Sequence, residues 1–323
     1  MAHGHLDPQH QEQLDPLILD SWKRCNKRLS PHNLPQPNQL SEQTLDTILR
    51  AHGELISVSI PFLEDIYETI RELECVLVLA DGTGCILATL GDSNVLAEWD
   101  KLKLLTGTFW SEGQLGTNAI GLALHNAMPS QVVGAEHFMD AYHHVATSAA
   151  PIHSHTGRII GLVGVITRAA VASAHDLALM MTTARAITNQ LQTNLYLSEA
   201  NHQLTQVNTI LETVIEGIVT WDDTGAITHL NQQASTMLGL DRHQVLGKLA
   251  VTTLGLSRSI IQTLSDHKEI VDAETTLKIN GRRITYIITL QPIWMGQQPK
   301  GYVALLKEVE RVRQLVSQQG GTQ

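Results

Sequence analysis

The sequence predicts an α+β protein in which two antiparallel-sheet domains are joined by a long helix and preceded by a helical segment. The first observation is a hairpin plan that occurs twice, as "LVLADGTGCILATLGD" and as "IVTWDDTGAITHLNQ", each with an Asp-x-x-Gly turn. The second is that further hairpins join neighbouring strands in each half, in place of alternating β-α-β units. The third is a stretch between the halves, residues 174–216, that contains neither Pro nor Gly.

The chain begins with two segments that precede the first sheet. Residues 1–16 are rich in His, Gln, Asp and Pro without apolar periodicity, so we expect a disordered tail. Residues 17–50 form the predicted helical segment, where "PLILDSWKRCNKRL" has Pro16 near its start and a Pro-rich break after it. In the next helical stretch Ser41 and Thr44 are possible caps, and we expect Pro61 to divide it in two.

Residues 51–185 are predicted to form the first mixed domain. Its hairpins are "CVLVLADGTGCILATLG" and the longer "ATSAAPIHSHTGRIIGLVGVITRA", and "QVVGAEHF" is a further strand. Between them, "SEGQLGTNAIGLALHNAM" predicts one short helix rich in small residues. The repeated Asp-x-x-Gly turn has a mechanical explanation, because Asp bonds to its own backbone and Gly supplies positive φ.

The linker helix, predicted over residues 186–216, carries a heptad-like pattern. Leucines recur every seven residues and smaller apolar residues fill the complementary positions, which favours a two-stranded coiled coil and therefore a homodimer. The alternative is a helix that only packs on its own domain. The predicted dimer contacts are Leu197, Leu204, Val207, Leu211 and Val214.

The second domain is predicted over residues 217–306. Its leading hairpin is followed by Asn231, a cap for the next helix, and then by three strands, two of which join across Asn280-Gly281. Residues 307–323 are predicted to be a C-terminal helix or linker toward an output module. Leu305, Val309 and the following apolar positions have the four-three-four spacing of a coiled coil.

Composition excludes several classes of function. No apolar run is long enough to span a membrane and the N-terminus lacks a signal-peptide layout, so we expect a cytoplasmic protein without membrane contact. The formal charge of −10 argues against direct nucleic-acid binding by these residues. The three cysteines form no C-x-x-C pair, which leaves reduced structural thiols as the expectation.

No catalytic, metal or cofactor site is predicted. The histidines between residues 137 and 155 lack the spacing of a ligand set, so exposed turn or capping roles are favoured over metal binding. Glu112 and Glu136 are the candidate pair of acids. Neither has a nucleophile or metal partner in the sequence, and Glu112 stands where a helix dipole stabilises an acid.

The segment "WSEGQLGTNAIGLAL" is the best candidate for a ligand pocket. Its glycines and alanines remove side-chain bulk, while hydroxyl and amide groups at a helix N-terminus suit a small polar or anionic ligand. Close packing of the helix on the sheet would use the same small residues, so both interpretations stay open. The candidate pocket residues are Trp110, Glu112, Thr117, Asn118 and His137.

Several motifs resemble known regulatory families. Residues 217–306, with "GIVTWDDTGAITHLNQQASTMLGLDRHQVLGK", resemble a PAS domain, and residues 51–190 resemble a GAF domain. "LDSWKRC", "QVVGAEHF" and "SAAPIHSHTGRIIGLVGV" resemble the sensory half of sigma-54-dependent activators of the acetoin and dihydroxyacetone type. "SWKRCNK", "ITLQPI" and "VERVRQLV" favour the dihydroxyacetone kinase operon type within that family.

This resemblance implies a non-enzymatic, dimeric signal-input region of a bacterial transcriptional activator. Its implied partners are the subunits of dihydroxyacetone kinase, with a small metabolite as the competing input. The chain lacks a G-x-x-x-x-G-K-[ST] loop, so we expect neither ATP hydrolysis nor promoter recognition from these residues, as in an excised sensory half. The alternatives are an acetoin-like small-molecule sensor, a stand-alone GAF-PAS adaptor and a GAF-fold enzyme.

Overall fold

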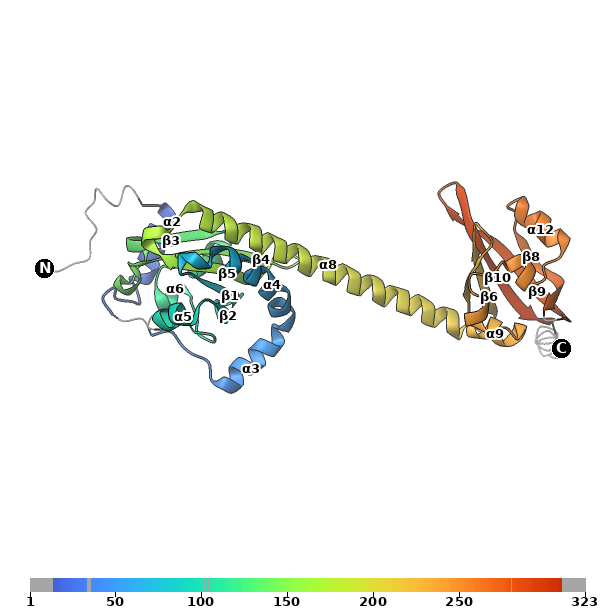
Figure 1. Cartoon of the computed structure of the whole chain (residues 1–323), viewed down its shortest axis with the longest axis horizontal. Helices are drawn as coiled ribbons and strands as arrows, with labels where there is room; N and C mark the ends of the chain where they lie inside the picture. The colour runs from blue at the N-terminus through green and yellow to red at the C-terminus, as the bar shows by residue number, and fades with distance from the viewer. Residues whose placement is uncertain (1–13, 34–35, 101–102, 104, 280, 310–323) are drawn as a thin grey trace, which may run out of the picture. The chain divides into compact units, whose positions relative to one another are not determined.

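The computed structural model describes residues 14–33, 36–100, 103, 105–279 and 281–309. The chain divides into two compact units, with the boundary between Ser198 and Glu199. Each unit contains a five-stranded antiparallel sheet (Figure 1), which confirms the predicted fold class. Residues 1–13 of the predicted N-terminal tail and most of the predicted C-terminal helix lie outside the described residues. The end of the predicted tail is wrong, because Asp15 caps helix α2 (Pro16–Cys25) and Pro16 is its first residue.

Helices lead into the first unit. Helix α2 (Pro16–Cys25) begins with Asp15, whose carboxylate accepts the Leu17 N–H at 2.8 Å, and has Pro16 at its first position as predicted. Helix α3 (Glu42–Ala51) is capped by Ser41 as predicted. Helix α4 (Gly53–Ile70) and the short 3₁₀ turn η1 (Arg71–Leu73) follow.

The predicted division at Pro61 is wrong. Pro61 lies inside α4, and the break between α3 and α4 falls at His52. Leu55 and Leu63, one on each side of the proline, are both buried on the sheet. Burial of both halves of α4 on one surface therefore outweighs the single helical hydrogen bond that proline removes.

The first sheet has the strand order β2-β1-β5-β4-β3. Its strands are β1 (Val76–Asp81), β2 (Ile86–Leu90), β3 (Ser130–Val133), β4 (Val145–His153) and β5 (Ile159–Arg168). Successive side chains of a strand point to opposite faces, so β1 contributes Val76 and Val78 to one core and Leu77 and Leu79 to the other. Both predicted hairpins of this unit are confirmed by their antiparallel registers.

Helices cover both faces of the first sheet. One face lies under α5 (Ser93–Asp100), α6 (Glu112–Leu115) and α7 (Ala119–Asn126), while α4 and the first half of α8 (Ala174–Thr213) cover the other. Short 3₁₀ turns complete the unit as η2 (Gly134–Glu136), η3 (Asp140–Tyr142) and η4 (Ala169–Val171). The single helix predicted from "SEGQLGTNAIGLALHNAM" is two helices, because Gly116 at φ 71° ends α6 and Asn118 starts α7.

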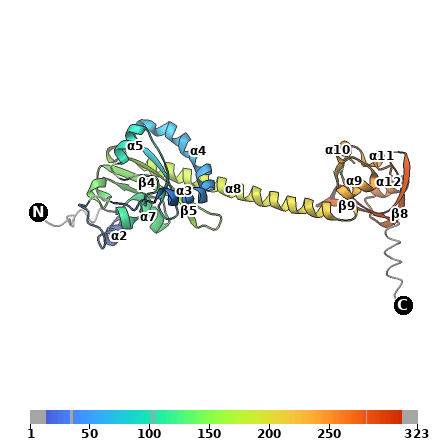
Figure 2. The ribbon, with the colours of Figure 1, turned by 90° about the horizontal axis from the view of Figure 1, so that it is seen from below.

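The second sheet has the order β7-β6-β10-β9-β8. Its strands are β6 (Gly217–Asp222), β7 (Ile227–Leu230), β8 (Ile270–Ile279), β9 (Arg282–Met295) and β10 (Gln298–Glu308). Helices α9 (Gln232–Leu238), α10 (Arg242–Val245), α11 (Ala250–Thr253) and α12 (Arg258–Ser265) gather on one side of it (Figure 2) and close a single apolar core.

The predicted C-terminal helix is wrong in its first part. Leu305 belongs to β10, where it pairs with Thr289 of β9 and Ile218 of β6. Strand β10 pairs with a neighbour on each side, so the backbone hydrogen-bonding groups of these residues are satisfied in the sheet. Their apolar spacing alone fitted a helix equally well.

The repeated Asp-x-x-Gly turn is built in the same way in both units, as its mechanical explanation predicts. Asp81 Oδ1 accepts the N–H groups of Thr83 and Cys85 at 2.8 and 3.0 Å. Asp222 Oδ1 accepts those of Thr224 and Ala226 at 2.9 and 3.0 Å. The hydrogen bond from the Thr224 hydroxyl, at 2.6 Å, and then the Ala226 N–H hold the pKa of Asp222 below its usual range.

Candidate functional site

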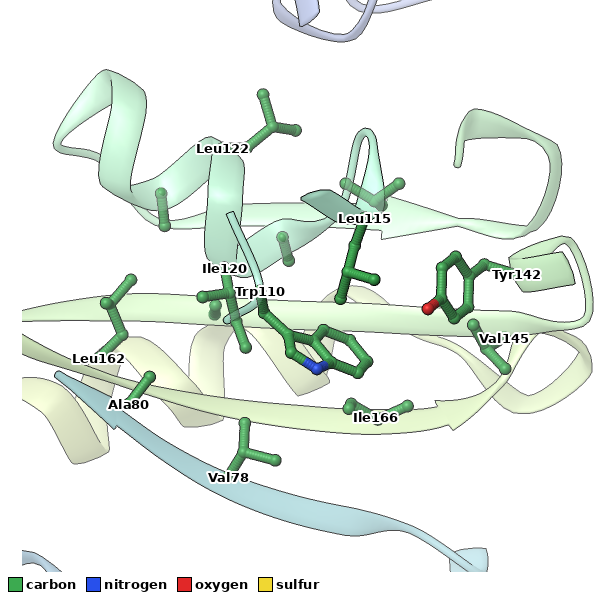
Figure 3. Close-up of a cluster of buried hydrophobic side chains, with 14 of the residues drawn as sticks. Val78, Ala80, Trp110, Leu115, Ile120, Leu122, Tyr142, Val145, Leu162 and Ile166 are labelled. Carbon is green, nitrogen blue, oxygen red and sulfur yellow. The ribbon is translucent and has the colours of Figure 1, made fainter. Parts of the chain in front are cut away.

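Trp110, the largest of the predicted pocket residues, lies inside the first apolar core. Figure 3 shows its indole among side chains from α7 and the sheet, with the Tyr142 ring nearby, at 6.0 Å between centroids. Its side chain is 2% exposed, and within the described part of the chain its Nε1 has no hydrogen-bond partner. The indole therefore fills space in the core through apolar contact alone.

Glu112 holds helix α2 against the first unit. Its two carboxylate oxygens accept hydrogen bonds from Arg24 Nε and Nη2, each at 2.8 Å, in a bidentate pair. The Glu112 side chain is only 11% exposed, so most of its surface is removed from water by this contact. The hydrogen bond to Glu112 raises the pKa of Arg24, as expected for a fork-to-carboxylate pair.

Thr117 is part of the same docking contact. Its hydroxyl lies 2.7 Å from Ser21 Oγ and 3.7 Å from Cys25 Sγ, and all three side chains are buried. Trp22 adds a bond from its Nε1 to the Glu136 carbonyl at 2.8 Å. The segment "WSEGQLGT" therefore binds helix α2. Spacing in the sequence could not reveal this role, because the residues of α2 and their partners are about a hundred positions apart.

Asn118 caps α7. Its Oδ1 accepts the Gly121 N–H at 3.0 Å and its Nδ2 donates to the Gly116 carbonyl at 2.9 Å. A Cβ on Gly121 would lie 2.8 Å from the Glu112 backbone nitrogen. The small residues thus permit a close approach between α6 and α7, which supports the packing interpretation of this segment.

His137 is buried with both ring nitrogens engaged. Nδ1 lies 3.0 Å from the Gly134 carbonyl and Nε2 lies 3.2 Å from Thr147 Oγ1, which in turn accepts the Ala119 N–H at 3.0 Å. This arrangement fits a neutral ring that donates from Nδ1 and accepts at Nε2. Burial, with a smaller contribution from the positive charge of His143, lowers the pKa of His137 to about 4.

The depressed pKa of His137 predicts acid sensitivity of the first unit. The unfolded chain takes up this proton below about pH 6.5, whereas the folded chain resists it until about pH 4, so stability falls as the pH drops through that window. We expect the wild-type free energy of unfolding to fall by about 2 kcal/mol from this group between pH 7 and pH 5. Urea unfolding of the wild type and of His137→Gln at both pH values measures this contribution. If both proteins lost the same free energy of unfolding between pH 7 and pH 5, His137 would not be its source.

The predicted pocket residues do not converge on one cavity. Glu112 lines a surface hollow of about 300 Å³ together with Arg24, Cys25 and Arg28. The other four are buried in the core or in caps, with the contacts given above. Their binding of a ligand stays a prediction. A larger hollow of about 570 Å³ lies instead at the β1–β2 and β4–β5 turns, which sequence reasoning did not single out.

The remaining candidate chemistries find little support in the described residues. No group of three or more His, Cys, Asp or Glu side chains there is arranged to hold a metal ion. All three cysteines are buried and free. Burial raises the pKa of Cys75 and of Cys85 to about 11, so neither thiol is activated as a nucleophile. Within the same residues, no helix has the length and apolarity needed to cross a membrane.

Four of the five predicted dimer contacts lie on α8, and Val214 directly follows its last residue, Thr213. Leu197, Leu204 and Val207 of α8 are 58%, 62% and 53% exposed, whereas Leu211 and Val214 are partly buried. Large apolar side chains at seven-residue spacing on an exposed helix are costly in water unless a second surface covers them.

A single amide joins the end of α8 to the second sheet. Asn231 is fully buried, and its Oδ1 accepts the N–H groups of Ile218 and Ala234, each at 2.8 Å. Its Nδ2 donates to the carbonyls of Leu211 and Glu216, each at 3.0 Å. Asn231 was predicted only as a helix cap; its bonds to Leu211 and Glu216 also fix where α8 ends.

Comparison with known proteins identifies both units. The family model for the MimR N-terminal domain matches residues 3–192, and the PAS fold model matches residues 205–309. The dihydroxyacetone kinase operon regulatory protein of Escherichia coli strain K12 is 31% identical over 95% of this chain and 48% of its own length. The acetoin dehydrogenase operon activator AcoR of Bacillus subtilis is 34% identical over 58% of this chain and 31% of its own.

A solved structure extends this similarity to three dimensions. The crystal structure of the E. coli DhaR(N)-DhaL complex contains a chain that is 30% identical, with a TM-score of 0.84 over 91% of this chain and all of that chain. The glycerol metabolism operon regulatory protein of Citrobacter freundii is 28% identical over 96% of this chain and 48% of its own length. The chain thus spans about half the length of the curated relatives it matches.

Proposed function

Because this chain belongs to the MimR N-terminal domain family and, with its PAS fold, to the sensory part of the dihydroxyacetone kinase operon regulators, we propose that it is the signal-receiving region of a bacterial transcriptional activator. The observation that carries the proposal is the similarity to the DhaR(N) chain, which extends over the whole of that chain. The input is a protein of the DhaL type, a dihydroxyacetone kinase subunit. In this proposal the residues described above bind the partner, form the dimer and transmit the signal, and they catalyse no reaction.

The protein-partner input is supported by how the first unit is filled. The residues that best suited a small-ligand pocket contact the protein itself, with Trp110 in the core and Glu112 and Thr117 against α2. Because its core is filled by its own side chains, the first unit offers its surface to a signal, and a protein partner acts there.

Isothermal titration of the 323-residue chain with the purified kinase subunits of the same source tests this input. We expect saturable binding of one subunit with a dissociation constant in the micromolar range or tighter, about −8 kcal/mol. Absence of binding by every subunit, together with a rise in melting temperature on addition of acetoin, would contradict it in favour of a small-molecule sensor.

Dimerisation through α8 is the second part of the proposal. The exposed positions Leu197, Leu204 and Val207 fit the a and d places of a two-stranded coiled coil. We expect Leu204→Lys to convert a dimer into a monomer in light scattering, because two lysines would face each other in an apolar seam. Thr209→Lys, at an exposed position of the same helix on the outer side of the seam, is the matched control and should leave the dimer intact. A monomeric wild type, or equal effects of both variants, would refute the seam.

Transmission uses the contacts at the end of α8. Glu212 Oε2 accepts the Gln232 N–H at 2.6 Å, and its Oε1 lies 2.8 Å from Arg242 Nη1. Together with the Asn231 amide, these bonds tie the last turn of α8 to β6 and α9. A change in the packing of α8 is therefore passed to the PAS unit as a displacement of its first strand and helix.

A further inference from the structure

A groove in the first unit is formed where four segments meet. These are the start of α4, the β1–β2 turn, the β4–β5 turn and α8 near Leu191. The main hollow has a volume of about 570 Å³. An adjoining hollow of about 200 Å³ shares Glu54, Ser154, Ile160 and Leu191 with it. A volume of this size accommodates a small metabolite.

Arg158 supplies a positive charge at this groove, and no described residue pairs with its guanidinium. The β4–β5 turn is fixed by Ser154, whose N–H donates to the Arg158 carbonyl at 2.8 Å and whose hydroxyl accepts the Arg158 N–H at 3.2 Å. Among the described residues, the Arg158 guanidinium makes neither an ion pair nor a hydrogen bond. The backbone of the turn is thus fixed, and the exposed Arg158 side chain carries a planar fork of donors, which suits a carboxylate.

The acids of the groove are placed differently from each other. Asp81 is nearly buried, and its Oδ1 is taken by Thr83 and Cys85, while its Oδ2 faces His52 Nε2 at 3.7 Å. Its charge is therefore directed at the turn and the imidazole. Glu54 is the other acid of the described lining and is exposed, so its charge would repel an anion bound in the groove.

The opposite wall is apolar and belongs partly to α8. Leu55, Ile160 and Leu191 line the main hollow, and Leu195, 44% exposed, lines its extension. Leu191 and Leu197 are six residues apart, a rotation of about 240° on an α-helix, so the groove and the proposed dimer seam use different sides of α8. A ligand in the groove would touch α8 and leave the seam open.

We propose that this groove is a binding site for a small organic acid. Its carboxylate pairs with the Arg158 guanidinium, and a short aliphatic body packs on Ile160 and Leu191. Through Leu191 the ligand contacts the helix that leads to the second unit. The site goes beyond the partner-protein function proposed above and is independent of it, because neither requires the other.

The test is a methyl NMR titration of the full 323-residue chain, labelled at Ile and Leu methyl groups. Three probes separate the chemistry: hexanoate carries both charge and chain, hexan-1-ol carries only the chain, and inorganic phosphate carries only charge. We expect hexanoate to shift the Ile160 and Leu191 signals in a saturable way, and hexan-1-ol to bind about tenfold more weakly. Phosphate should leave the Leu191 signals in place.

Three variants test the charges of the groove, and two of them should change hexanoate binding in opposite directions. Arg158→Ala should weaken hexanoate binding about tenfold, whereas Arg185→Ala, an exposed arginine of α8 outside the groove, should not change it. Glu54→Gln should tighten binding about threefold by removing a like charge. The proposal is overturned if hexanoate leaves the groove signals unshifted, if either other probe binds as tightly, if the two arginine variants have equal effects, or if Glu54→Gln weakens binding.

Discussion

Replacing Asn231 with alanine is expected to lower the free energy of unfolding of the second unit by about 3 to 4 kcal/mol. The buried amide makes four hydrogen bonds, and alanine would leave two N–H groups and two carbonyls without partners. Chemical denaturation followed by tryptophan fluorescence, or hydrogen exchange of β6, measures the loss.

The control for Asn231 is another asparagine of the same unit. Asn201 is exposed on α8, and among the described residues its side chain makes no hydrogen bond, so Asn201→Ala should change stability by less than about 0.5 kcal/mol. Asn231→Asp adds a second test, because a carboxylate there would face the Leu211 and Glu216 carbonyls and should be at least as harmful as alanine. A tolerated Asn231→Ala would show that α8 is not held by this amide.

Replacing Trp110 with alanine is expected to cost the first unit about 3 to 5 kcal/mol, since it empties the centre of an apolar core. Because its Nε1 has no partner among the described residues, Trp110→Phe loses only packing and should cost about 1 to 2 kcal/mol. Urea unfolding of the full chain gives both values.

Trp294 provides the matched tryptophan. Its side chain is 51% exposed on β9, so Trp294→Ala should cost less than about 1 kcal/mol. If Trp110→Ala were as mild as Trp294→Ala, the indole would not be a core residue, and its predicted role at a ligand pocket would gain weight.

The features that sequence analysis predicted correctly are those set by local chemistry. Turns closed by Asp81 and Asp222 depend on contacts within four residues, and the Asn231 cap depends on the next three, so composition and spacing were sufficient. The exposed leucines of α8 follow a seven-residue period that is also visible in the sequence alone. The fold class followed from these elements.

What the sequence could not predict depends on distant contacts. The small residues of "GQLGTNAIGLAL" suit a pocket and close packing equally, and the choice depends on Arg24 and Ser21 reaching them from a helix about ninety positions earlier. Pro61 stays inside α4 because the sheet beneath buries both of its halves. The groove beside Arg158 combines four separate segments, and a polar turn in the sequence gives no sign of it.

Helix α2 is attached to the first unit by contacts with residues far along the chain, which affects how such a unit can be exchanged between genes. Glu112, Thr117 and the Glu136 carbonyl direct their bonds to residues that precede the first strand by some fifty positions. A gene fusion that began at the first strand would remove the counter-ion of Glu112 and would uncover the buried Thr117 hydroxyl, which pairs with Ser21 of α2. We therefore expect recombination between genes to transfer helix α2 and the first sheet together, as one unit.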